Sequence, residues 1–120
     1  MRDHTKLRAF ELADQLVLAI YKATRDFPRE ELFALTSQMR RSAVSIASNI
    51  VEGCARSSQA DYLRFLDMAY GSARELEYQV TVAHRLGYLQ PAPYERLLPQ
   101  CTETSKVLGG LIRSFRSSNA

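Results

Sequence analysis

Polar side chains recur at helical spacing between residues 38 and 56. The row consists of Gln38, Ser42, Ser45, Asn49, Glu52 and Arg56. Because an α-helix turns about 100° per residue, positions three and four apart fall near one line on its surface. Amides, hydroxyls, a carboxylate and a guanidinium in one line offer hydrogen bonds to a ligand or to a partner protein. The chemistry that this row favours is recognition.

A second row follows between residues 61 and 79. It consists of Asp61, Phe65, Met68, Ser72, Glu75 and Gln79. This row is polar at its ends and is interrupted by two apolar side chains, whereas its small central serine would let a neighbouring helix backbone approach closely. From the two rows we define the polar stripe as Gln38, Ser45, Asn49, Glu52, Ser72 and Glu75.

Two interpretations of the polar stripe are open. In the first, the rows are solvated faces or a polar seam closed by hydrogen bonds between helices and subunits. A buried unpaired polar group costs roughly 1–3 kcal/mol and a buried carboxylate more, so Glu52 and Glu75 need Arg, Ser or Asn partners if they are covered. Arg56, four residues after Glu52, is well placed for a helical ion pair. The second interpretation makes a recognition surface of Gln38, Arg41, Asn49 and Glu52, and burial of all four in one chain would count against it.

Arginines spread over the predicted helices are the candidate contacts to nucleic acid, because a guanidinium can bind a phosphate through two hydrogen bonds. They are Arg40, Arg41, Arg56, Arg64, Arg74, Arg113 and Arg116. The chain carries 16 basic and 13 acidic residues, a net charge of +3, and its sequence pI is about 9.1. Since acidic residues interleave with the arginines, a solvated, ion-paired face is the alternative for a single chain. In an oligomer, repetition of a weak basic patch multiplies phosphate contacts.

Motifs of catalytic or metal sites are absent from the sequence. It has no Glu-x-x-His pair, no Cys-x-x-Cys, no His-Glu-x-x-His, no glycine-rich phosphate loop and no Gly-x-Ser-x-Gly. His84, near the end of a predicted helix, is expected at the surface or beside the helix C-terminus. Cys54 and Cys101 occupy apolar positions and are expected to be reduced and buried. We therefore expect no enzyme, no metal and no cofactor, with catalysis by Gln38, Asn49 and Glu52 as a minor hypothesis.

Apolar residues at spacings of three and four define the elements that must position these side chains. The pattern predicts helices over about residues 4–26, 31–56, 58–86 and 93–116, and a disordered tail over residues 117–120. Pro28 separates the first two helices, Ser58 resembles an N-cap, and Gly87 resembles a left-handed C-cap. Short connections make sequential helices antiparallel neighbours. The sequence thus predicts one all-α domain, residues 1–120, folded as an antiparallel up-down four-helix bundle.

Nothing in the sequence indicates a membrane span or a secretory signal. No stretch approaches the ~18 uncharged apolar residues that a span needs, and no signal-peptide core follows the first six residues. We expect a cytoplasmic protein without a membrane partner.

One stretch is more specific than bundle patterning. Residues 38–53 read Gln-Met-Arg-Arg-Ser-Ala-Val-Ser-Ile-Ala-Ser-Asn-Ile-Val-Glu-Gly. This run resembles the signature of the four-helix-bundle proteins encoded in intervening sequences of bacterial 23S ribosomal RNA genes, a family also found away from those genes. The resemblance continues in Phe27-Pro28, in residues 62–77 and in residues 86–89. Val51 stands where the family usually has Ala, and Phe10 lies near a common Trp position; both are apolar exchanges.

The resemblance implies a four-helix protomer and, from relatives, a ring-like homopentamer. Similar bundles serve as accessory proteins of diversity-generating retroelements, where a basic pentamer binds nucleic acid and a reverse transcriptase. The leading hypothesis is therefore a non-catalytic homopentamer that binds RNA or DNA. The alternative is an adaptor that presents the polar stripe to a protein partner without binding nucleic acid.

Overall fold

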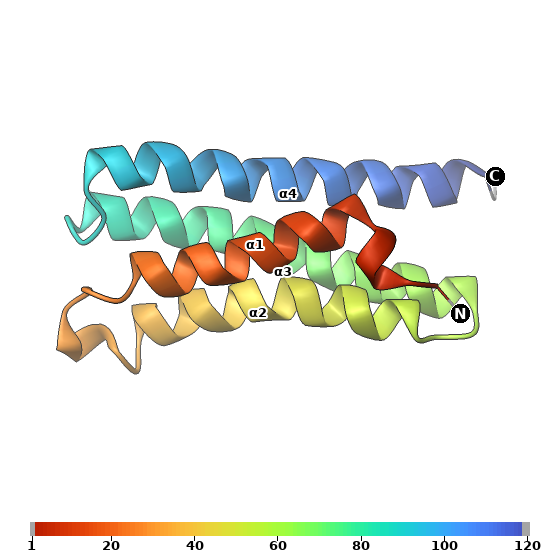
Figure 1. The fold of residues 1–120 in the computed structure, drawn as a ribbon, viewed down its shortest axis with the longest axis horizontal. Helices are drawn as coiled ribbons and strands as arrows, with labels where there is room; N and C mark the ends of the chain where they lie inside the picture. Colours follow the sequence, from red (N-terminus) through yellow and green to blue (C-terminus); the bar gives the residue numbers. More distant parts are fainter. Residues whose placement is uncertain (1, 119–120) are drawn as a thin grey trace.

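Four long helices run side by side along the molecule (Figure 1). The computed structural model describes residues 2–118. Its helices are α1 (Arg8–Ala23), α2 (Leu35–Cys54), α3 (Gln59–Arg85) and α4 (Pro91–Ser118), with short 3-10 turns η1 (His4–Lys6) and η2 (Arg29–Glu31). The α1–α2 and α3–α4 connections lie at one end and the α2–α3 connection at the other (Figure 1).

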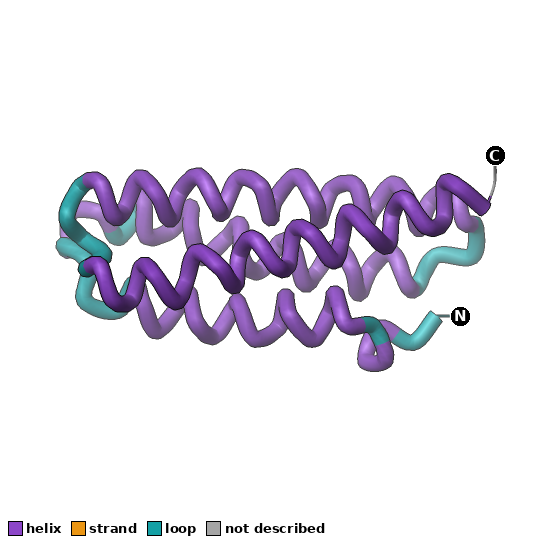
Figure 2. The backbone as a smooth tube through the Cα atoms, turned by 90° about the horizontal axis from the view of Figure 1, so that it is seen from above, coloured by secondary structure: helices purple, strands orange, loops and turns teal. Residues whose placement is uncertain are grey.

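Each helix packs against two others, so that the four enclose one core. Seen from above, the helices run along the molecule and the loops that connect them lie at its two ends (Figure 2). Helix α1 lies between α2 and α4, and α3 lies between the same two on the opposite side. The α2–α3 contact is the most extensive of the four. No strand occurs among residues 2–118. The prediction of an antiparallel up-down four-helix bundle is confirmed.

The core consists of the apolar stripes that the helical spacing predicts. Ile46, Ile50, Leu66 and Leu108 are fully buried at its centre. Ala13, Ala43, Ala69 and Ala73 lie among them and keep the helices close. Removing a large apolar side chain from water is worth roughly 1.5–3 kcal/mol, so this core is the main source of the fold's stability.

The first connection is longer than the sequence predicts, because tertiary contacts end α1 early and delay α2. Helix α1 ends at Ala23, where the Thr24 hydroxyl donates a hydrogen bond to Ile20 O at 2.8 Å. Phe27 then folds back into the core. Helix α2 begins at Leu35, whose N–H donates to Glu31 Oε1 at 3.3 Å. The predicted start at residue 31 is thus wrong. Glu31 lies before the helix, and its side chain accepts a hydrogen bond from the first residue of α2.

The later helix ends follow the sequence signals more closely. Ser58 is the N-cap of α3 and its hydroxyl accepts a hydrogen bond from Asp61 N at 3.1 Å. Gly87 has a φ of 81°, the left-handed conformation expected of a residue just past a helix end. Helix α4 starts at Pro91 instead of residue 93 and continues to Ser118. The predicted tail is therefore helical at residues 117 and 118, and its last two residues lie outside the described part of the chain.

Within residues 2–118, no helix combines the length and the apolar character that crossing a bilayer requires.

Candidate functional site

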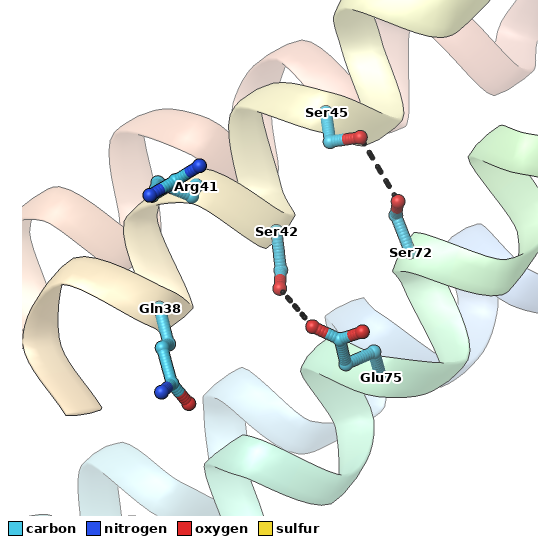
Figure 3. Close-up of a pocket in the computed structure, with 6 residues that line it drawn as sticks. All are labelled: Gln38, Arg41, Ser42, Ser45, Ser72 and Glu75. Atoms are coloured by element: carbon cyan, nitrogen blue, oxygen red, sulfur yellow. Dashed lines mark hydrogen bonds between the residues drawn. The ribbon is translucent and has the colours of Figure 1, made fainter. Parts of the chain in front are cut away.

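The polar stripe forms much of the boundary between α2 and α3. Its two serines face each other, with Ser45 Oγ and Ser72 Oγ 3.0 Å apart (Figure 3). One turn along, the Ser42 hydroxyl donates to Glu75 Oε1 at 3.1 Å. Beside these contacts lies an open hollow of about 360 Å³. It is lined by Gln38, Arg41, Ser42, Ser45, Ser72 and Glu75.

Asn49 extends the seam beyond the two serines. Asn49 Nδ2 donates to Ser45 Oγ at 3.0 Å and to Ser45 O at 2.9 Å. Since Ser45 Oγ accepts from Asn49, its single proton is available for Ser72 Oγ. Ser45 Oγ can also accept a second hydrogen bond, so either serine can be the donor in the contact between them. The structure thus brings together four of the six stripe residues as lining groups and holds Asn49 behind them.

Both glutamates are exposed, so the prediction about partners of covered carboxylates does not apply, although each has a hydrogen-bond partner. Glu52 accepts from Arg56 at 2.7 Å, in an exposed ion pair. Glu75 Oε1 accepts from Ser42 and also from Gln79 Nε2 at 3.2 Å. Glu52 lies apart from the hollow, so the row that looked continuous in sequence is divided into two groups.

The two interpretations of the stripe therefore describe different parts of it. Ser45, Ser72 and Asn49 act as a closed seam, whereas Gln38, Arg41 and Glu52 are exposed to solvent. Burial of all four proposed recognition residues would have counted against a recognition surface. Three of the four are exposed, so this argument against it does not apply. The hollow offers the Arg41 guanidinium, the Gln38 amide and serine hydroxyls to a polar ligand.

Close approach of α2 and α3 depends on Gly53. A Cβ atom placed on Gly53 would lie 2.9 Å from Phe65 Cβ and 3.3 Å from Tyr62 O. Phe65 is in turn covered by two guanidinium groups, from Arg56 at 4.8 Å and Arg64 at 4.6 Å from the ring centroid. The sequence row that placed Phe65 among polar residues is explained, because this ring closes the end of the seam.

Most of the predicted nucleic-acid arginines are already partnered. Arg56, Arg64, Arg74 and Arg116 form ion pairs with Glu52, Asp61, Glu77 and Asp67, respectively. Arg40 lies over the Tyr21 ring and its Nε donates to Thr24 Oγ1 at 2.9 Å. Among the described residues, Arg41 and Arg113 have no ion-pair partner. The seven do not form one patch: they are distributed over three sides of the bundle.

Three of these arginines meet on the surface shared by α3 and α4. The Arg116–Asp67 ion pair joins the two helices there. Next along the helices, Arg74 Nη1 donates to the Tyr70 hydroxyl at 3.5 Å. Arg113 Nη1 and the Tyr70 ring both lie close to Gly109. The sequence marks Gly109 only as a residue that weakens its helix, and it does not indicate that Tyr70 lies nearby, because their proximity depends on how α3 and α4 are aligned.

The surface shared by α1 and α2 is apolar. Leu18, Tyr21, Val44 and Val51 are 69%, 44%, 38% and 37% exposed. Phe10, Val17 and Ala47 are half-buried beside them, at positions that face the same groove by helical spacing. Neighbouring exposed apolar side chains on a small protein are typical of a contact surface. The sequence analysis assigned no function to these residues.

The cysteine and histidine side chains of the bundle have structural surroundings. No group of three His, Cys, Asp or Glu side chains in residues 2–118 is arranged to hold a metal ion. Burial raises the pKa of the Cys101 thiol to about 12, so it stays protonated and unreactive near neutral pH. His84 stacks on Tyr94 at 4.0 Å and its Nδ1 lies 2.9 Å from Leu89 O. It braces the α3–α4 connection, a structural contact in addition to the surface position that we predicted.

Comparisons with known proteins agree with this architecture. No curated protein shows significant sequence similarity to the chain. A crystal structure of a protein of unknown function from the S23 ribosomal protein family of Bacteroides thetaiotaomicron is similar, with 27% identity and a TM-score of 0.80. The similarity covers 88% of this chain and 95% of that chain. The profile of the 23S rRNA-intervening sequence proteins matches residues 5–110, and the chain therefore belongs to that family.

Proposed function

We propose that this protein is a non-catalytic subunit that assembles with copies of itself into a homopentamer and binds RNA or DNA. The observation that carries the proposal is the division of its surface. An exposed apolar side lies on α1 and α2, and a group of three arginines, Arg74, Arg113 and Arg116, lies on the α3–α4 surface. The first favours contact with protein and the second favours contact with phosphate.

The apolar side supports assembly with a second copy of the chain. Leu18, Tyr21, Val44 and Val51 remain in water in the single protomer, although each would gain from burial. In a ring, each copy meets its two neighbours through two different surfaces. The α1–α2 surface supplies one of these.

The positive charge supports binding of nucleic acid. Each chain carries a net charge of +3, and a pentamer repeats that charge five times around one particle. Phosphate contacts release counterions, so the affinity of such a particle falls steeply with salt concentration. The interaction needs no sequence-specific contact, since the charge is read from the phosphate backbone.

Two measurements test the proposal. Native mass spectrometry is expected to find a particle of about five times the chain mass of 13.6 kDa. Fluorescence anisotropy with labelled single-stranded RNA and DNA is expected to show binding at low salt that weakens as salt is added. A 13.6 kDa particle contradicts assembly, and a flat titration at low ionic strength contradicts nucleic-acid binding.

The α2–α3 hollow favours a second candidate function, an adaptor that binds a protein partner through the polar stripe. The observation behind it is that Gln38 and Arg41 are exposed at the rim of the hollow. A partner that co-purifies after nuclease treatment, and that is lost in a Gln38→Ala/Arg41→Ala variant, supports the adaptor. Retention of that partner by the variant counts against it.

A further inference from the structure

We propose that phosphate groups of the bound nucleic acid are held at a notch on the α3–α4 surface, formed by Tyr70, Arg74, Gly109 and Arg113. This inference rests on the proposed nucleic-acid binding and names the place where it occurs. We call these four residues the phosphate notch.

Gly109 makes the notch possible. A Cβ atom placed there would lie 3.2 Å from Arg113 Nη1 and 3.3 Å from Tyr70 Cε1. Both groups therefore border the space that a methyl group at position 109 would take, and one of them would have to shift slightly to admit it. Gly110 is different, because a Cβ atom there meets only Arg113 Nη2 at 4.0 Å. Glycine inside a helix is unfavourable compared with alanine, and the packing of Tyr70 and Arg113 gives a physical reason for it at position 109.

The notch places donors side by side. Arg74 Nη1 donates to the Tyr70 hydroxyl, and the Tyr70 ring and Arg113 Nη1 both lie close to Gly109. Tyr70 is half-buried, so its ring is held by the protein and restricts both arginines. A guanidinium presents its N–H groups in a planar fork that matches two oxygens of a phosphate. The Tyr70 hydroxyl accepts from Arg74 and keeps its own proton for a phosphate oxygen.

The charges on this surface favour an anion. Arg74 is paired with Glu77 at 3.7 Å, and Arg116 is paired with Asp67. Arg113 has no carboxylate partner among the described residues. Lys106 stands three residues before Gly109 and seven before Arg113, which places it on the same side of α4. Four basic groups thus face two carboxylates.

The hollow around Arg2 and Arg56 is less suited to phosphate. It lies at the α2–α3 connection and is lined by Arg2, Ala55, Arg56 and Ser57. Its Arg56 is bound to Glu52 at 2.7 Å, and the Arg2 guanidinium lies 4.0 Å from the centroid of the Tyr62 ring. Neither arginine there is as free to receive an anion as Arg113.

A pair of matched charge variants tests the notch. Arg113→Gln removes the unpaired guanidinium, and Arg96→Gln removes one from an exposed position of α4 outside the notch. Binding is measured by fluorescence anisotropy with labelled oligouridylate and oligothymidylate at several salt concentrations. We expect Arg113→Gln to weaken binding about tenfold and to lower the salt slope by about one unit per contacting protomer. Arg96→Gln is expected to change both values much less.

A pair of glycine variants tests the geometry without removing charge. Gly109→Ala forces Tyr70 or Arg113 to move and is expected to weaken binding severalfold. Gly110→Ala leaves the notch intact, so it is expected to bind as the wild type does and to melt a few degrees higher. Tyr70→Phe, which keeps the ring and removes only the hydroxyl, serves if Gly109→Ala does not fold.

The outcomes separate the two proposals. If the wild-type protein binds neither oligonucleotide at low salt, nucleic-acid binding itself is wrong. If it binds both, but Arg113→Gln and Arg96→Gln behave alike, binding stands and the phosphate notch is wrong. The notch is supported as the site if both Arg113→Gln and Gly109→Ala weaken nucleic-acid binding. Where Gly109→Ala does not fold, weaker binding by Tyr70→Phe takes its place.

Discussion

Helix α2 meets its two neighbours through surfaces of opposite character. Toward α3 it presents Ser42, Ser45 and Asn49, whose polar atoms are bonded within the chain. Toward α1 it presents Val44 and Val51, which stay partly in water. The α2–α3 contact is therefore satisfied in the single protomer, whereas the α1–α2 surface is not. The α2–α3 contact therefore supports the fold, and the α1–α2 surface is available for assembly.

The largest expected effect comes from a charge on the apolar surface. Val51→Glu places a carboxylate where we propose that a second copy packs, and an unpaired buried charge costs several kcal/mol. Because Val51 is already 37% exposed, the protomer should keep its helical circular dichroism. Native mass spectrometry is expected to show a shift from the oligomer to 13.6 kDa.

Tyr78→Glu is the control for this prediction. It also replaces an exposed apolar side chain by a carboxylate, but on α3 and away from the α1–α2 surface. It is expected to leave the particle mass of the assembly unchanged. An oligomer that survives Val51→Glu, or one that dissociates equally with Tyr78→Glu, would break the assignment of the apolar surface to assembly.

The next effect concerns the opposite side of α2. Gly53→Ala adds a methyl group 2.9 Å from Phe65 Cβ, so α2 and α3 must separate. Overpacking of this kind costs typically about 1–3 kcal/mol, more than the gain of about 1 kcal/mol in helix propensity. We expect a lower free energy of unfolding in a urea titration followed by circular dichroism.

Gly71→Ala gives the matched comparison for Gly53→Ala. A Cβ atom on Gly71 has no neighbour within 4 Å, so this change should stabilise the helix by about 0.5–1 kcal/mol. Equal effects of the two alanines would mean that the α2–α3 contact is looser than the distances indicate.

The sequence predicts what depends on local spacing. The four helices and the core residues Ile46, Ile50, Leu66 and Leu108 follow from apolar positions three and four apart. The pair Glu52–Arg56 also follows, since its members are four apart on one helix. Burial and helix geometry are enough to predict these features, because none of them depends on how the helices are aligned with one another.

Features that depend on tertiary alignment could not be predicted in the same way. The end of α1 is set by contacts of Thr24 with both Ile20 and Arg40, sixteen positions further along the chain. Glu31 is held outside α2 by the Tyr88 hydroxyl at 2.9 Å, a contact between residues 57 positions apart. For the same reason the polar stripe looked continuous in sequence but separates into the seam around Ser45 and the exposed ion pair of Glu52.

We expect the smallest change in the free energy of unfolding for a substitution within the seam itself. Ser45→Ala removes the hydroxyl that joins Asn49 to Ser72, and the half-buried groups left behind regain hydrogen bonds only in part from water. Net hydrogen-bond contributions of about 0.5–1.5 kcal/mol set the scale of the loss. In a double-mutant cycle with Ser72→Ala, we expect the two losses to be less than additive, because each change breaks the same bond. Unfolding of the two single variants and the double variant in urea measures this coupling. A coupling of zero would mean that the two serines are solvated neighbours and that no hydrogen bond closes the seam at this point.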